Sequence, residues 1–156
     1  MQKMKKISLV ILLLVTFAFS ANAQGGNGYQ NAVGVRAGWG AEASYQRYLD
    51  LNHRLEFGLG INRYGFDATG IFQWMFDIPS NTSGQFKWYA GAGVGTGGWY
   101  NKDYSGFSLG FKGQIGIEYT FKIPLLLSMD YRPGLYLLPS TTFDWSSFAV
   151  GVRYCF

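Results

Sequence analysis

FAVGVRYCF, residues 148–156, is the stretch that decides the fold of this chain. Its large apolar side chains occupy every second position, from Phe148 through Val150 and Val152 to Phe156, and small or polar residues stand between most of them. Successive side chains of a β-strand point to opposite faces of the sheet. The stretch therefore predicts a strand with one apolar face and one face that is small or polar.

The same alternation continues toward the N-terminus. In residues 106–121, for example, apolar residues such as Phe111 alternate with polar residues such as Lys112. Gly, Pro, Asn and Asp, which favour turns, separate segments of this kind. The pattern predicts eight strands, over residues 31–40, 41–49, 53–63, 66–77, 86–100, 106–121, 124–138 and 143–156.

Residues 1–23 have the features of an export signal. Lysines precede an apolar run at residues 7–19, and small residues supply a peptidase site that ends at Ala23. The run is too short to cross a bilayer as a helix, which needs about 20 residues. We therefore expect cleavage after Ala23, a short tail at residues 24–30 and one domain at residues 31–156.

The charge balance excludes the usual nucleic-acid interpretation of a basic chain. The formal net charge is +4, but three of the 13 Lys and Arg residues belong to the leader, which leaves 10 against 9 acidic residues. We therefore expect no nucleic-acid partner. Cys155 is the only cysteine and His53 the only histidine, so an internal disulfide is impossible and we expect no metal or other cofactor.

Alternation alone does not tell which face of the sheet points outward. A water-soluble barrel of the lipocalin type has its apolar face inside and a charged face in water. Charged residues make up only 14% of this chain, too few to solvate such a surface. A sheet in a bilayer must close, because hydrocarbon leaves unpaired amides unsatisfied. We predict an all-β fold: a closed, eight-stranded antiparallel up-and-down transmembrane β-barrel with a side-chain-filled lumen.

Aromatic residues near the predicted strand ends support the outward orientation of the apolar face. Such rings suit the boundary between hydrocarbon and water. The two charges that the pattern places on the lipid face, Arg47 and Arg63, also lie near strand ends. The residues expected at the boundary are Trp39, Trp74, Trp88, Tyr119 and Phe121.

The leader, the eight alternating segments and the aromatic last strand resemble the small outer-membrane barrels of the OmpA/OmpX type. The resemblance implies that the last strand is the recognition signal for the barrel-assembly machinery, through Phe148, Gly151, Tyr154 and Phe156. It also implies periplasmic chaperones, outer-membrane lipids and lipopolysaccharide as partners, and a monomer. The departures are short outer loops and no peptidoglycan-binding domain after Phe156.

Ten charged residues fall on the polar faces, five of each sign. An eight-stranded lumen is just wide enough for side chains to fill, so balanced charges favour a paired network that plugs the barrel. The alternative is a narrow ion path, or a gate made by rearranged pairs. The ten residues are Arg36, Glu42, Glu56, Asp67, Lys87, Lys112, Glu118, Asp130, Arg132 and Arg153.

Three features that could suggest chemistry have simpler interpretations. Residues 93–98 satisfy the G-x-G-x-x-G dinucleotide pattern, but no helix follows, so these glycines are expected to give room in the lumen. His53 is expected in a turn on the periplasmic side, away from the outer leaflet where lipid A-editing barrels have serine–histidine sites. Cys155 is expected to point inward as small packing filler.

Pro133 is the one residue that conflicts with the pattern, because proline cannot donate to a ladder and a closed barrel has no free edge. We interpret it as a bulge near the outer rim, with a true turn as the alternative. The function expected from these features is a non-enzymatic protein of the bacterial outer membrane, with a role in envelope integrity or surface properties. The alternatives are a small pore, an adhesin or ligand-binding surface protein, and a lipid A-modifying enzyme.

Overall fold

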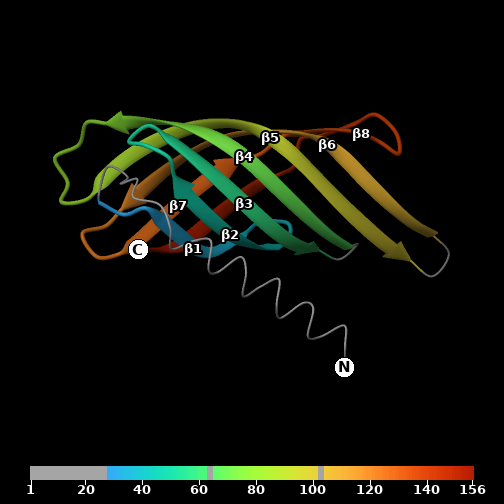
Figure 1. The fold of residues 1–156 in the computed structure, drawn as a ribbon, viewed down its shortest axis with the longest axis horizontal. Helices are drawn as coiled ribbons and strands as arrows, with labels where there is room; N and C mark the ends of the chain where they lie inside the picture. Colours follow the sequence, from blue (N-terminus) through green and yellow to red (C-terminus); the bar gives the residue numbers. More distant parts are fainter. Residues whose placement is uncertain (1–27, 63–64, 102–103) are drawn as a thin grey trace, which may run out of the picture.

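The computed structural model describes residues 28–62, 65–101 and 104–156, which form a sheet of ten strands and no helix (Figure 1). The predicted leader and most of the tail lie outside these residues, as does Arg63. The described part of the chain holds no helix that could cross a membrane. The strands are β1 (Asn31–Ala37), β2 (Ala41–Tyr48), β3 (His53–Asn62), β4 (Gly65–Ile78), β5 (Gln85–Asn101), β6 (Tyr104–Thr120), β7 (Leu125–Tyr131), β8 (Gly134–Leu138), β9 (Thr142–Asp144) and β10 (Phe148–Cys155).

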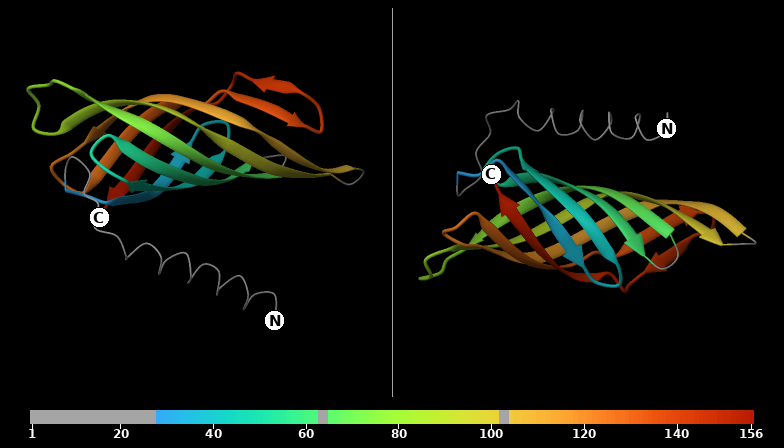
Figure 2. Two further views of the ribbon diagram at one scale, coloured as in Figure 1. Left: turned by 45° about the horizontal axis from the view of Figure 1, so that its top comes forward. Right: turned by 90° about the horizontal axis from the view of Figure 1, so that it is seen from below.

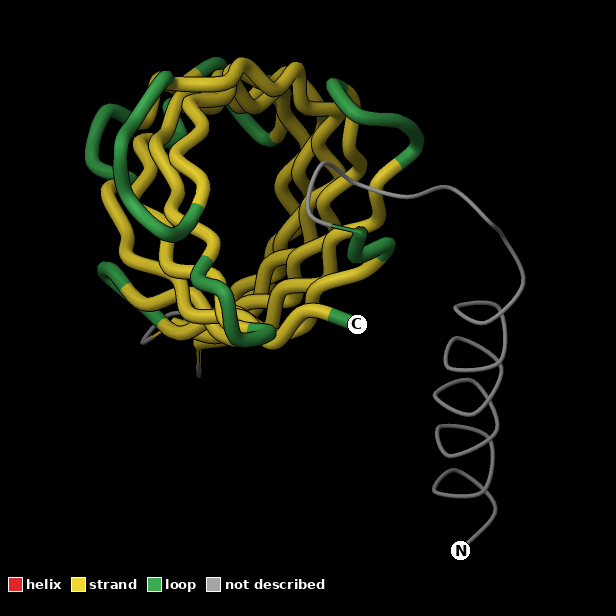
Figure 3. The backbone as a smooth tube through the Cα atoms, turned by 90° about the vertical axis from the view of Figure 1, so that its left-hand side faces the viewer, coloured by secondary structure: helices red, strands yellow, loops and turns green. Residues whose placement is uncertain are grey.

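The sheet closes on itself, and every pairing is antiparallel (Figure 3). Strands β1 to β6 pair in sequence, and β1 also pairs with β10. Strand β6 pairs with β7 and then with β8, while β10 pairs with β7 and β9 pairs with β8. The segments β7 with β8, and β9 with β10, are thus two interrupted strands of an eight-stranded wall. The predicted closed antiparallel barrel is confirmed.

Pro133 interrupts the seventh strand without turning the chain. On the β6 side, Ile115 pairs with Tyr131 and Lys112 with Gly134. Residues 113–114 of β6 therefore lie opposite residues 132–133, with no extra residue on either side. Gly113 N–H donates to the Pro133 carbonyl at 2.9 Å, but proline has no N–H to return the bond. On the opposite side, residues 145–147 face only two residues. A bulge is present, and its extra residue lies in that facing segment, so eight strands are retained.

The two ends of the barrel differ (Figure 2). We call one the termini end, because β1 begins and β10 ends there; it also carries the connections at residues 49–52, 79–84 and 121–124. The opposite end, which we call the far end, carries residues 38–40 and 139–141. Strands β5 and β6 reach beyond their neighbours at the far end (Figure 1).

Glycines of β5 allow the wall to bend closely around the interior. A Cβ on Gly93 would overlap the carbonyl oxygen of Gly70 on β4, and backbone cannot rotate away as a side chain can. A Cβ on Gly70 would meet only the Phe57 ring, at 3.8 Å. The two glycines therefore differ in how much a methyl group should disturb the wall.

We predict that Gly93→Ala lowers the free energy of unfolding by about 1–3 kcal/mol, because the strands must separate to admit the methyl group. Gly70→Ala is the matched control and should stay within about 0.5 kcal/mol of the parent. Urea titration of the refolded protein in detergent measures both. Equal stabilities of the two variants would contradict the close approach at Gly93.

Candidate functional site

The barrel interior gathers the charged side chains that the strand alternation turns inward. Along β10, every second residue is buried, so Arg153 points inside while Val152 and Tyr154 point outside. Asp67 on β4 is half-buried at the far end. The other predicted inward charges are buried: Arg36, Glu42, Glu56, Lys87, Lys112, Glu118, Asp130, Arg132 and Arg153.

Glu56 on β3 lies at the centre of the interior network. Its Oε1 accepts from Arg132 Nη2 at 2.6 Å and from Arg153 Nη2 at 3.4 Å. Its Oε2 accepts from the amides of Gln46 and Gln73 at 2.7 and 2.8 Å. A fully buried carboxylate is stable only with such opposite charge and hydrogen bonds. These donors come from β2, β4, β10 and the segment between β7 and β8, so the contacts brace the barrel across its interior.

Two further contacts extend the network toward the far end. Arg132 Nη1 donates to both carboxylate oxygens of Glu42, at 3.0 and 3.1 Å. Arg36 Nε donates to Asp130 at 2.9 Å, which joins β1 to β7. Both pairs combine charge with directed hydrogen bonds, the geometry in which ion pairs are strongest.

Arg54 completes the interior charges and was missed in the sequence. It is fully buried, and its Nη2 lies 2.9 Å from Glu118 Oε2. Its guanidinium carbon lies 5.2 Å from the ring centroids of both Tyr48 and Tyr89. The signal was present, since Arg54 is two residues before Glu56 and shares its face of β3.

Apolar side chains also enter the interior at the termini end. Tyr48, Met75 and Tyr89 form one buried cluster there, and a second contains Ala32, Leu126 and Cys155. Cys155 is buried, as its predicted inward position requires. The other five residues share the parity of inward polar residues, so parity alone could have found them. These two clusters and Arg54 occupy the interior at this end.

The far end instead holds a cavity of about 450 Å³. Aromatic residues on its lining include Trp39, Tyr136 and Phe148. Lys112 Nζ donates to Tyr136 Oη at 2.6 Å. The charged residues that line the cavity are Arg36, Glu42, Asp67, Lys112, Arg132 and Asp144.

The features considered for catalysis or cofactors lie apart from this cavity. His53 is at the termini end, where its Nδ1 lies 2.8 Å from the Asp50 carboxylate. Hydrogen bonds from the Asn52 backbone and from His53 hold the pKa of Asp50 below its usual value. Residues 93–98 lie inside β5, with no helix after them. Within the described ranges, no three His, Cys, Asp or Glu side chains form a metal-binding group.

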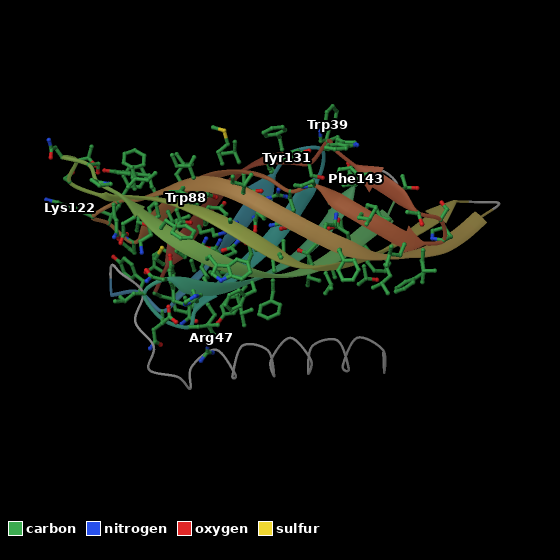
Figure 4. All side chains as sticks on the ribbon, turned by 90° about the horizontal axis from the view of Figure 1, so that it is seen from above. Trp39, Arg47, Trp88, Lys122, Tyr131 and Phe143 are labelled. Atoms are coloured by element: carbon green, nitrogen blue, oxygen red, sulfur yellow. The ribbon has the colours of Figure 1, made fainter. Side chains whose placement is uncertain are left out.

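The outer wall is apolar and carries the predicted aromatic residues. Trp39 is at the far end and Trp88 toward the termini end (Figure 4). Trp74, Tyr119 and Phe121 also lie toward the termini end. Trp88 stacks on Phe76, with ring centroids 4.2 Å apart. The four residues matched to an assembly signal lie on β10 or directly after it: Phe148, Tyr154 and Phe156 are exposed on the outer wall, and Gly151 is buried on the inner face.

We predict that Arg132→Ala and Glu118→Ala each lower the free energy of unfolding by about 3–5 kcal/mol. Arg132→Ala removes the cation that Glu42 and Glu56 share, and Glu118→Ala removes the carboxylate that pairs with the buried Arg54. Lys122→Ala, at an exposed turn, is the control and should change it by less than about 0.5 kcal/mol. Urea titration of the refolded barrel measures all three. If Arg132→Ala and Glu118→Ala unfold at the parent's urea concentration, the charges do not brace the wall.

Replacing both members of one pair provides a second check. The double variant Arg54→Met with Glu118→Met exchanges charges for apolar groups and leaves neither partner unpaired, so it should be more stable than Glu118→Ala. The same urea titration compares them. A double variant less stable than the single one would mean that the pair contributes beyond mutual neutralisation.

No protein-family model, curated protein or solved structure matches this chain. Its resemblance to the OmpA/OmpX-type barrels is therefore one of pattern and architecture. The function must be argued from the closed barrel, its charged interior and its apolar exterior.

Proposed function

We propose that this chain is an integral protein of the bacterial outer membrane, with a non-catalytic role in the integrity or surface properties of the envelope. The observation that carries the proposal is the distribution of side chains across the wall. Leu59 and Ile61 are 66% and 69% exposed on the outside of β3, while Arg54 and Glu56 are fully buried inside it. In a water-soluble barrel the two faces would be exchanged.

Two bands of exposed aromatic residues support a bilayer around the barrel. Trp74 and Trp88 are exposed toward the termini end, and Trp39, Phe143 and Trp145 toward the far end. Aromatic girdles flank the apolar band of outer-membrane barrels at both interfaces. Exposed aromatic residues toward both ends of the wall match that arrangement.

The orientation and partners follow from this proposal. Bacterial barrels of even strand number hold both termini in the periplasm. The termini end would then face the periplasm, and the far end the outside, next to lipopolysaccharide. Periplasmic chaperones and the barrel-assembly machinery would deliver the chain, the latter through the β10 pattern. Because ring closure pairs β1 with β10, the barrel needs no second copy to complete its sheet.

A pore is the less favoured function, because buried side chains occupy the interior at the termini end. Arg54 lies between the rings of Tyr48 and Tyr89, and Met75 packs beside them. Barrels with aqueous channels have 16 or more strands. His53, the residue that a lipid A-modifying enzyme would use, is at the end opposite to the outer leaflet in this orientation.

A charge placed on the outer wall distinguishes a bilayer from water. We predict that Leu59→Arg lowers the free energy of unfolding in lipid bilayers by about 2–4 kcal/mol, because arginine is costly near the bilayer midplane. Leu51→Arg, in the turn before β3, should cost about 0–1 kcal/mol. Denaturant titration in vesicles measures the difference. If both variants match the parent, hydrocarbon does not surround β3.

We also predict that the purified protein gives no steady, reproducible openings in planar bilayers. We expect the buried side chains of Arg54, Tyr48 and Tyr89 at the termini end to block a water path along the axis. A 16-stranded porin reconstituted in the same way is the positive control. Reproducible single-channel steps from the parent barrel would overturn the structural role in favour of the pore.

A further inference from the structure

The buried cations of the described chain can be matched one to one with carboxylates. Six lysine and arginine side chains are buried, and each has a different acidic partner. Five of the partners lie within 3.4 Å of the cation, and the ammonium of Lys112 interacts electrostatically with the Asp144 carboxylate. The pairs are Arg36 with Asp130, Arg54 with Glu118, Lys87 with Asp77, Lys112 with Asp144, Arg132 with Glu42, and Arg153 with Glu56.

Asp67 is the inward acid that this matching leaves over. It is half-buried on β4 and lines the far-end cavity. Within the described ranges its carboxylate takes part in no hydrogen bond or ion pair. The carboxylate lies against Gly60 of β3, because a Cβ on Gly60 would overlap Asp67 Oδ1. A carboxylate that is partly removed from water is stabilised by an opposite charge, and this barrel supplies none beside it.

A second polar group of the cavity lining also has no partner in the described chain. Arg132 is 2% exposed, and its two terminal nitrogens bind Glu42 and Glu56. Its Nε–H has no hydrogen-bond acceptor. Burying a donor without an acceptor destabilises a structure. An oxygen atom of a ligand in the cavity is the kind of acceptor that this N–H lacks.

We propose that the far-end cavity binds a small organic monocation, with its ammonium group at Asp67 and a hydroxyl oxygen elsewhere in the molecule. One unmatched carboxylate accounts for one positive charge, and the arginines and lysine of the lining disfavour a ligand with two. Tyr136 and Phe148 add aromatic surface to the lining. The cavity volume of about 450 Å³ lies within the range of small-molecule sites. The ligand class is therefore an aromatic monoamine that carries a hydroxyl group.

The test compares three probes of similar shape that differ in charge. Tyramine is cationic, tyrosol is neutral and 4-hydroxyphenylacetate is anionic. Calorimetry at pH 7 measures their binding to the full mature barrel in an uncharged polyoxyethylene detergent, with detergent alone as the blank. We expect tyramine to bind at least tenfold more tightly than either of the other two. Phenethylamine, which lacks the hydroxyl group, should bind about threefold more weakly than tyramine.

Asp67→Asn removes the unmatched charge and keeps the shape of the side chain. It should weaken tyramine binding at least tenfold. Asp50→Asn makes the same change in an exposed turn at the termini end, so tyramine should bind this control as it binds the parent. Because Asp67 has no partner in the described chain, Asp67→Asn should also unfold at the parent's urea concentration, unlike Arg132→Ala.

The proposal fails if tyramine does not bind the parent, if it binds no more tightly than tyrosol, or if Asp67→Asn binds it normally. Tighter binding of 4-hydroxyphenylacetate than of tyramine would also refute it. Equal binding of phenethylamine and tyramine would overturn the requirement for a hydroxyl group. If Asp67→Asn does not refold, or unfolds at a lower urea concentration, Asp67 has a structural partner and the matching is wrong. None of these outcomes bears on whether hydrocarbon surrounds the wall.

Discussion

The pairing of β1 with β10 is the constraint on which the rest of this structure depends. It closes the sheet into a ring, and it separates an inside from an outside. Once the ring is closed, strand alternation alone decides which side each residue occupies. The apolar residues of the β10 pattern then cover the exterior, and Arg153 joins the interior network. Closure of the ring therefore places the charged residues in the barrel interior and the apolar residues on its outer surface.

The interior network gives this architecture its register. A shift of one residue between neighbouring strands would move an entire inward set to the outer wall. Glu56 would then lose Arg132 and Arg153, and these arginines would point into the surroundings of the barrel. The cost of such a shift makes the network a determinant of specificity, even where each ion pair alone contributes little net stability.

The sequence was sufficient for the closed fold and for the direction of most side chains, because period-two alternation is local. It failed where three-dimensional packing decides. Arg54 is absent from the predicted inward set although it shares the parity of Glu56 within the predicted strand 53–63. The bulge was expected at Pro133, but its extra residue lies in residues 145–147. The cavity could not be foreseen, since residues from eight of the ten strands line it and no sequence pattern reports their mutual distances.

The interrupted last strand has a consequence for the depth of the barrel in a bilayer. Strand β9 pairs with β8. Strand β1 pairs with β2 and with β10, and its pairing with β10 ends toward the far end at Ala37 and Val150. Beyond that pair, the backbone edge of β9 has no strand beside it within the described ranges. Hydrocarbon does not tolerate such an edge, whereas water and headgroups hydrate it. In a membrane, the acyl chains must therefore end near Val150 on this side of the barrel, and β9 lies among the headgroups. The part of the wall that contacts hydrocarbon is then shorter here than along β5 and β6.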